Sequence, residues 1–378
     1  MTAFHLVPTE APYDEMAASR VGSWCGDRRS RRAPLCLLVA FVALLGAASQ
    51  LRAHGQQSGA DRTRGVVLTY ELDPGEAPDG RPGKLDPERI PWDSLVRALE
   101  ARLRSAGAQG CSVKRVGDAR AEIVVYETDP AKVTPLKRWI SATGVLEFRV
   151  VANSWDHEWI LAAAKRQAAD PAQRRRRVVV DSQGKRVGFW ALAGRAKPVG
   201  DIRPLRVSVT NCTIRNAATG ELVALPETVD RDGKYAVERH LAEQQIPDIE
   251  VLMATDDGFD VMGVHIRQVS RDVDETGRPC VDFVMTDRGA GLMGGLTGTA
   301  LPDRDRGVYR MLGIVLDGEL LSAPRVMSLI ADRGRITGAF TQEEVDYLVG
   351  IVQAGALPIA LKKTPISEKP FGPASPPP

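Results

Sequence analysis

The chain has 378 residues, enough for about two folded units, each with an ordinary hydrophobic core. Hydrophobic residues make up 43% and charged residues 26%, which excludes a wholly disordered chain and a protein built of many membrane helices. The formal net charge of +2 excludes a strong positive electrostatic field over the whole chain that would attract nucleic acid. The five cysteines are dispersed and form no CxxC pair, which is typical of zinc or redox sites.

The first predicted element is an apolar run at residues 35–48, directly behind an arginine cluster at 28–32. Positive charge stays on the cytoplasmic side while an apolar run enters the membrane, so this pattern predicts an export signal or a membrane anchor. The run is shorter than the roughly 20 residues of a spanning helix. Gly46 and Ala48 also fit a cleavage site, so a cleaved signal and a retained single-pass anchor both stay open.

From Gly65 onward, short apolar strands alternate with amphipathic helices. Strand-like runs occur at 65–72, 111–116, 121–127 and 145–151, and helical periodicity occurs at 93–106 and 129–144. The order strand, helix, strand, strand, helix, strand is typical of the split βαβ, ferredoxin-like fold. The sequence therefore predicts an antiparallel sheet with two helices on one face, ending with the strand at 145–151.

The middle of the chain gives a weaker pattern. A predicted helix at 155–169 runs into four arginines, Arg174 to Arg177. No aromatic residues are interleaved with them, so we interpret the tract as a solvated surface rather than a nucleic-acid site. Short strand-like pieces fill residues 178–262, which predicts an inserted lobe.

The last third contains two strong local signals. Asp317 and Gly318 separate apolar runs at 313–316 and 319–322, and an Asp-Gly pair in that setting predicts a tight hairpin. Thr341 and Glu344 have capping-box spacing, which predicts the start of a helix. That helix is expected to end at Gly355, with Pro358 beyond it.

Catalytic, cofactor and metal patterns are weak throughout. The run GAGLMG at 289–294 matches GxGxxG, but further glycines up to Gly307 are expected not to sustain the helix that receives a pyrophosphate. His157 lacks a second histidine one turn later, and Asp256, Asp257 and Asp260 lack calcium-loop spacing. We therefore expect no enzyme activity, no cofactor and no bound metal.

Three separate motifs carry a resemblance to a known family. LDGELLSAP at 316–324, ITGAFTQEE at 336–344 and AGALP at 354–358 together resemble the first periplasmic domain of SecD, an accessory subunit of the Sec protein translocase. VLEFRV at 145–150 fits as well, and the glycine-rich run resembles the head helix of that family. The family's opening motif, GxDLxGG, stands here at 59–65, with arginine in place of its leucine and of its first paired glycine.

The resemblance implies an α+β fold: a ferredoxin-like base with an inserted α+β head subdomain, preceded by one membrane anchor or signal segment. The expected division is a basic leader at 1–33, an anchor or signal core at 34–50, the base at 59–151, the head at 152–335, a return helix of the base at 336–361, and a disordered Pro-rich tail at 362–378.

The resemblance also implies roles for single residues. Structural roles are expected for the motif positions Asp61, Gly65, Asp317, Gly318, Ser322, Pro324, Gly338, Thr341, Glu344, Gly355 and Pro358. Contacts to an unfolded polypeptide are expected from apolar side chains at Leu292, Met293, Leu296, Leu320 and Leu321. For any one of these five, an ordinary core position is the simpler interpretation.

The implied function is a non-catalytic accessory module for protein export, held at the cytoplasmic membrane with its bulk in the periplasm. Expected partners are the Sec translocon, full-length SecD and SecF proteins, and exported polypeptide, but not nucleic acid. The family's later membrane helices, which are linked to proton-driven work, have no counterpart in this sequence, so no proton coupling is expected. Two alternatives stay open: an envelope binding or scaffold protein that keeps only the fold, and a truncated or split gene product.

Overall fold

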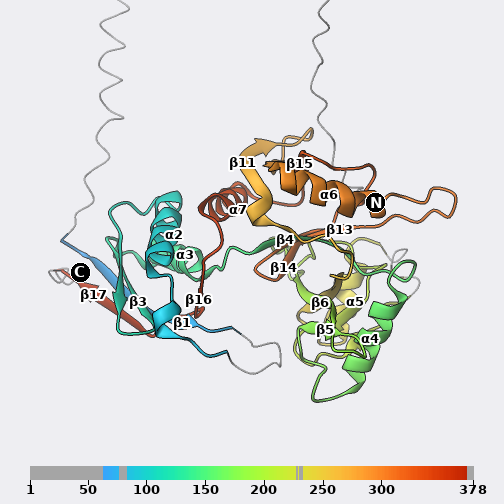
Figure 1. Cartoon of the computed structure of the whole chain (residues 1–378), viewed down its shortest axis with the longest axis horizontal. Coiled ribbons are helices and arrows are strands. Elements are labelled where there is room, and N and C mark those ends of the chain that lie inside the picture. The colour runs from blue at the N-terminus through green and yellow to red at the C-terminus, as the bar shows by residue number, and fades with distance from the viewer. Residues whose placement is uncertain (1–62, 76–82, 227–228, 230–232, 373–378) are drawn as a thin grey trace, which may run out of the picture.

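In the computed structural model, which describes residues 63–75, 83–226, 229 and 233–372, the first unit is an antiparallel sheet packed against two helices (Figure 1). We call it the base unit. Its elements are β1 (Gly65–Asp73), a 3-10 turn (Pro87–Arg89), α2 (Trp92–Ser105), β2 (Ser112–Val116), β3 (Arg120–Val125), α3 (Pro130–Ser141), β16 (Ala360–Leu361) and β17 (Ser367–Phe371). The strand order is β16-β1-β3-β2, and β17 also pairs with β1.

The apolar spacing of the sequence explains the packing of the base unit. Alternate residues of β1 are buried, because successive side chains of a strand point to opposite faces. In α2, Leu95, Leu99 and Leu103 form one buried stripe at helical spacing. In α3, Asp129 caps the first turn, with its side chain accepting a hydrogen bond from the Ala131 amide at 2.9 Å.

The strand predicted at 145–151 forms as β4 (Leu146–Val150), but its predicted place in the base sheet is wrong. It pairs instead with β13 (Leu312–Leu316) and β10 (Val261–Met262) in the second unit. Four of the five residues of β4 are buried. A strand needs cover on both faces to bury consecutive side chains, and only the second unit provides it.

The place beside β1 is taken by the C-terminal segment. β17 pairs antiparallel with β1 from Gly65↔Phe371 to Thr69↔Ser367, so the disordered tail predicted at 362–378 is wrong for these residues. Pro370 is tolerated because β17 is an edge strand, where a missing N–H leaves no neighbour unpaired. The Phe371 ring lies edge-on to Tyr126, with centroids 5.8 Å apart.

The second unit contains a nine-stranded sheet in the order β10-β4-β13-β14-β6-β9-β7-β8, with β5 also on β6. Its further elements are α4 (Glu158–Ala169), β5 (Val178–Val180), β6 (Arg186–Ala193), β7 (Ile214–Asn216), β8 (Leu222–Val223), α5 (Ala236–Glu243), β9 (Ile249–Ala254) and β14 (Glu319–Ser322). α4 packs on the face that carries Trp190, and Leu241 of α5 packs on the opposite face with Phe189.

A smaller sheet completes the second unit, in the order β11-β12-β15. Its strands are β11 (Ile266–Val273), β12 (Pro279–Met285) and β15 (Arg333–Ile336), with a 3-10 turn (Gly263–His265) before β11, and its helices are α6 (Asp287–Thr299) and α7 (Gln342–Ala354). α7 contacts both α2 and β11, so it lies between the two units (Figure 1). Gly350 lets α7 also pack closely on α3, because a Cβ at this position would overlap the Trp139 ring of α3.

The glycine-rich run forms a helix, as the resemblance to the family's head helix implies and against the expectation drawn from its glycines alone. α6 begins at the Thr286 cap, whose hydroxyl accepts a hydrogen bond from the Gly289 amide at 3.1 Å. Gly289 and Gly295 let the helix approach closely, since a Cβ on either would overlap His265 or the Phe259 ring. The GxGxxG residues thus lie inside the helix rather than in a loop before it, which is not the geometry of a dinucleotide site.

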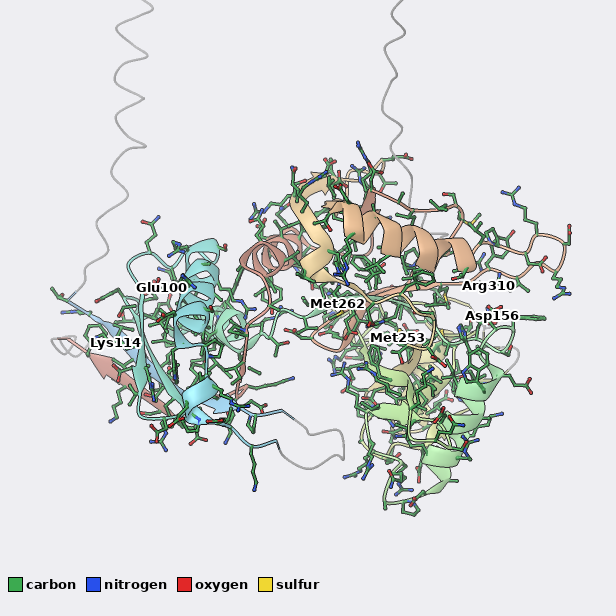
Figure 2. All side chains as sticks on the ribbon, in the orientation of Figure 1. Glu100, Lys114, Asp156, Met253, Met262 and Arg310 are labelled. Carbon is green, nitrogen blue, oxygen red and sulfur yellow. The ribbon has the colours of Figure 1, made fainter. Side chains whose placement is uncertain are left out.

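Among the described residues, no helix is both long and apolar enough to cross a membrane. The predicted leader at 1–33, the anchor or signal core at 34–50 and Asp61 lie outside the described residues. Figure 2 shows Glu100 and Lys114 on the base unit, and Asp156 and Arg310 at the end of the second unit farthest from it.

Candidate functional site at the junction of the two units

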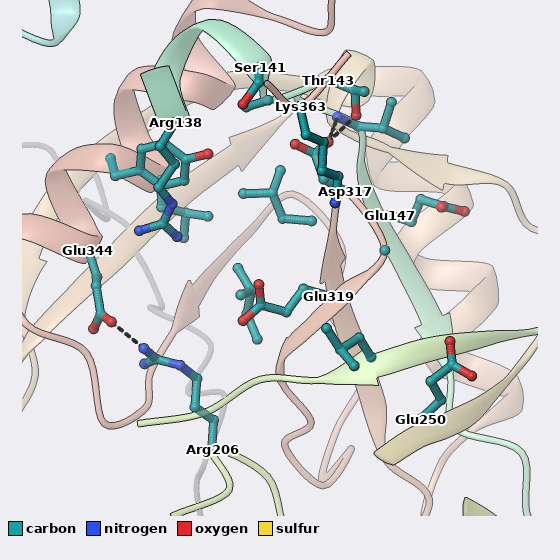
Figure 3. A pocket seen from close by; sticks show the side chains of 18 of the residues that line it. Arg138, Ser141, Thr143, Glu147, Arg206, Glu250, Asp317, Glu319, Glu344 and Lys363 are labelled. Atoms are coloured by element: carbon teal, nitrogen blue, oxygen red, sulfur yellow. Dashed lines mark hydrogen bonds and ion pairs between the residues drawn. The ribbon is translucent and has the colours of Figure 1, made fainter. Parts of the chain in front are cut away.

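A cavity of about 660 Å³ lies where the base unit meets the second unit, and we call it the junction cavity (Figure 3). It is formed by the end of α3, the start of β4, the β13–β14 hairpin, the segment after β6, and α7. Its apolar lining consists mainly of Leu192, Leu316, Leu321, Phe340, Tyr347 and Leu348.

The tip of the β13–β14 hairpin forms one wall of the cavity. Asp317 and Gly318 have φ values of 51° and 83°, which confirms the tight turn predicted from this pair. The Asp317 carboxylate accepts hydrogen bonds from the Val145 amide, at 2.8 Å, and from the Thr143 hydroxyl. The Asp317 amide in turn donates to the Val145 carbonyl at 2.9 Å. The hairpin tip is therefore fastened to the segment that joins α3 to β4.

Arg102 fastens the same segment from the base unit. Its fully buried guanidinium donates to the carbonyls of Ala142, Thr143 and Gly355, the last two at 2.9 Å. Burial lowers the pKa of Arg102 to about 10, and the charge of Asp317 opposes that shift, so the side chain is protonated at neutral pH. Sequence reasoning missed this residue, although an arginine beside the apolar stripe of α2 was an available signal.

The end of α7 converges on this segment as well. Gly355 ends the helix with φ 78°, as its position in the sequence predicts. The Leu357 amide then donates to the Thr143 carbonyl at 2.7 Å. The hairpin and AGALP motifs, distant in sequence, therefore bind one short segment, residues 142–145.

The predicted capping box is confirmed, and it has a second role at the cavity. The Thr341 hydroxyl accepts from the Glu344 amide at 3.3 Å, and the Glu344 carboxylate accepts from the Thr341 amide at 2.9 Å. Glu344 also forms an ion pair with Arg206, which additionally donates to the Ala339 carbonyl at 3.1 Å. Figure 3 shows this pair closing one side of the cavity.

The other charged residues of the lining carry both signs: Arg138, Arg177 and Lys363 are cations, and Glu147, Glu250 and Glu319 are carboxylates. Among the described residues, no carboxylate lies within ion-pair distance of Arg138, Arg177 or Lys363. The Arg138 guanidinium lies 4.1 Å from the centre of the Tyr347 ring. No group of three or more described His, Cys, Asp or Glu residues could hold a metal ion. The cavity therefore combines an apolar lining with charges of both signs.

Most of the five predicted polypeptide contacts are core residues. Met293, Leu296 and Leu320 are fully buried, so their predicted role as contacts is wrong. The inward turn of α6 and the inner face of the sheet hold them in two hydrophobic cores. Leu292 is half-buried against one of these cores, and only Leu321 lines the junction cavity.

The other motif residues stabilise local structure. The Ser322 hydroxyl donates to the Thr337 carbonyl at 3.0 Å, and the Pro324 carbonyl accepts from the Leu312 amide at 2.9 Å. Gly338 packs against the Phe340 ring, where a Cβ would be crowded. These contacts agree with the structural roles that are predicted for Ser322, Pro324 and Gly338.

Comparison with known proteins gives a matching family. Residues 240–359 match the family model described as SecDF, P1 head subdomain. The SecD subunit of the protein translocase of Aquifex aeolicus is 33% identical over 145 residues, which are 36% of this chain and 27% of that protein. The SecD subunit of Elusimicrobium minutum is 26% identical over 304 residues, which are 75% of this chain and 58% of that protein.

A solved structure described as "Structure and function of a membrane component SecDF that enhances protein export" aligns at 16% identity with a TM-score of 0.44. The alignment covers 78% of this chain and 96% of that chain. Overlap at this score is loose, so the relationship rests on the sequence matches.

The P1 head match begins later than the predicted head and extends through α7, while the matched segments span between about a quarter and three fifths of the two relatives. Residues 240–359 are therefore similar to the SecDF P1 head subdomain, which confirms the resemblance to SecD predicted from the three motifs.

Proposed function

We propose that this chain acts in protein export as a SecD-like accessory module, and that the junction cavity binds a segment of the exported polypeptide. The match to the P1 head is the observation that carries this proposal. The matched residues supply one wall of the cavity, including Asp317, Glu344 and Tyr347, and the base unit supplies the other, including Arg138.

The chemistry of the cavity favours an unfolded chain as ligand. Its apolar lining can take large side chains, which a folded protein does not present in an extended segment. Its charged side chains of both signs can bind backbone carbonyl oxygens and amide groups, which every exported polypeptide carries. A volume of about 660 Å³ holds a few residues at a time, so the site would bind many sequences weakly.

The finer assignments belong to the same proposal. The bulk of the chain would work on the periplasmic side of the cytoplasmic membrane, held or delivered by residues 34–50, without enzymatic activity of its own. The base unit would be a ferredoxin-like base whose fourth strand is β17, since β17 and β16 occupy the place beside β1. Its partners would be the Sec translocon and the SecD and SecF proteins.

Photocrosslinking in intact cells tests the proposal. A photoreactive amino acid replaces Leu192, which lines the cavity and is 38% exposed, in cells that contain an export-stalled polypeptide. The control position is Lys114, on β2 far from the cavity (Figure 2). We expect an adduct with the stalled polypeptide from Leu192 and none from Lys114. Adducts with other envelope proteins only, at normal abundance of the chain, would favour the scaffold alternative and refute the export role.

A further inference from the structure

A second cavity, of about 320 Å³, lies at the other end of the β4–β13 pair. The junction cavity is lined by Val145 and Leu316, at one end of this pair, and the second cavity by Val151 and Met311, at the other. The strands are paired over five residues, so the two cavities are separated by roughly 17 Å along the strand direction. We call the second cavity the aromatic pocket.

Two of the residues that line it are exposed aromatic residues. Trp155 is 65% exposed and Tyr309 is 40% exposed. Trp155 belongs to the turn after β4, and Tyr309 to the segment between α6 and β13. Exposed Trp and Tyr beside a cavity are typical of binding surfaces, because they contribute a large contact area at a small cost in side-chain entropy.

The segments that carry these two residues are held in place by polar contacts. The Trp155 amide donates to the Asn153 side chain at 3.0 Å, which fixes the turn. Arg310 donates two hydrogen bonds to the Asp156 carboxylate, at 2.6 and 2.7 Å, and one to the Leu301 carbonyl at 2.6 Å. This bidentate pair ties the turn that carries Trp155 to the segment that carries Tyr309 (Figure 2). The pocket is therefore organised before any ligand binds.

The pocket also carries one free cation. Arg310 is neutralised by Asp156, whereas Arg325, which lines the same pocket, has no carboxylate partner among the described residues. The Arg325 guanidinium lies 5.1 Å from the centre of the Tyr309 ring. A ligand that places an apolar group on the two rings would find a positive charge beside it, so a neighbouring anionic group is favoured.

We propose that the aromatic pocket binds an aromatic or large apolar side chain of an extended polypeptide whose neighbouring residue is Asp or Glu. The apolar side chain stacks against Trp155 and Tyr309, and the carboxylate pairs with Arg325. This inference rests on the proposed function, because it takes exported polypeptide as the ligand, and it adds a second site with a sequence preference.

Peptide binding to the purified full chain tests this. The probes are short, dye-labelled Gly/Ser peptides with a central Phe-Asp, Phe-Lys or Ala-Asp pair, followed by fluorescence anisotropy. We expect Phe-Asp to bind most tightly, and Trp155→Ala or Tyr309→Ala to raise its dissociation constant by about tenfold. Arg325→Gln should remove the preference for Phe-Asp over Phe-Lys.

The chain offers matched controls. Trp159 is an exposed tryptophan on α4 that does not line the pocket, and Arg304 is an exposed arginine that does not line it either. Trp159→Ala and Arg304→Gln should leave all three dissociation constants unchanged. Because the three test variants lie on three separate segments, misfolding of one, seen by circular dichroism, leaves the other two informative.

Two outcomes would overturn the inference: equal binding of Phe-Asp and Ala-Asp, or equal losses in the test and control variants. An adduct at Leu192 together with absent peptide binding would remove the aromatic pocket and leave the export role intact. Tight peptide binding without the Leu192 adduct would leave the aromatic pocket as a peptide site and would remove polypeptide binding in the junction cavity.

Discussion

Replacing Arg102 by methionine should weaken the junction of the two units more than any surface change. The wild-type guanidinium is fully buried and donates to three carbonyl oxygens, on Ala142, Thr143 and Gly355. Each such hydrogen bond contributes about 1 kcal/mol net, and a buried carbonyl left without a donor costs more. Methionine fills most of the volume and carries no charge to bury, which offsets part of the loss. We expect Arg102→Met to lower the free energy of unfolding by about 3 kcal/mol.

Urea unfolding of the full chain, followed by tryptophan fluorescence, measures this change, because Trp139 packs at the junction beside Tyr347 with ring centroids 5.1 Å apart. Arg104 provides the control: it lies on the same helix, and its side chain is 66% exposed. Arg104→Met should change the free energy of unfolding by less than about 0.5 kcal/mol. If Arg102→Met and Arg104→Met unfold at the same urea concentration, Arg102 does not fasten the junction.

Three further predictions concern single side chains. Gly318→Ala should destabilise the chain by about 1 kcal/mol, because its φ is 83°. The new Cβ also meets the end of the flexible Arg177 side chain, which can shift away, so Gly307→Ala, with positive φ and open space, should cost a similar amount in the same thermal melt. Glu344→Ala should cost about 2 kcal/mol, since it removes both the cap of α7 and the partner of Arg206; loss of α7 helicity by circular dichroism checks it. His157 is buried, and burial lowers its pKa despite Asp156. Neutral His157 therefore stabilises the folded chain in full above the pKa of about 6.5 that it has in the unfolded chain. This stabilisation is lost as the pH falls from there toward the lower pKa of the folded state. Urea midpoints at pH 7.5 and 5 should differ less in His157→Gln than in wild type, and an unchanged difference would contradict this.

Local signals in the sequence were enough for the elements that border the junction cavity. The Asp317–Gly318 turn and the Thr341–Glu344 cap depend on residues a few positions apart, and the structure confirms both. The convergence of the hairpin tip and the AGALP segment on residues 142–145 depends on long-range contacts, which no local pattern encodes. The sequence therefore predicted the turn and the helix start that border the junction cavity, but not the cavity itself.

The errors of sequence reasoning have a common physical origin. β4 looks like the last strand of the base, and β17 like a tail, because a strand pattern does not say which sheet the strand joins. α6 looks unable to form a helix because propensity counts the cost of glycine but not the close packing that glycine permits at Gly295. The sequence also made Met293 and Leu296 look available for ligands, because it does not show the tertiary packing that buries them.

The most direct test of polypeptide binding in the junction cavity is the yield of the Leu192 adduct with an export-stalled chain when a lining charge is reversed. Arg138 faces the cavity from α3, and Arg104 lies on the exposed face of α2. Arg138→Glu should reduce the adduct yield several-fold, whereas Arg104→Glu should not change it. Equal yields in the two variants, or an equal adduct from Lys114, would contradict binding in this cavity.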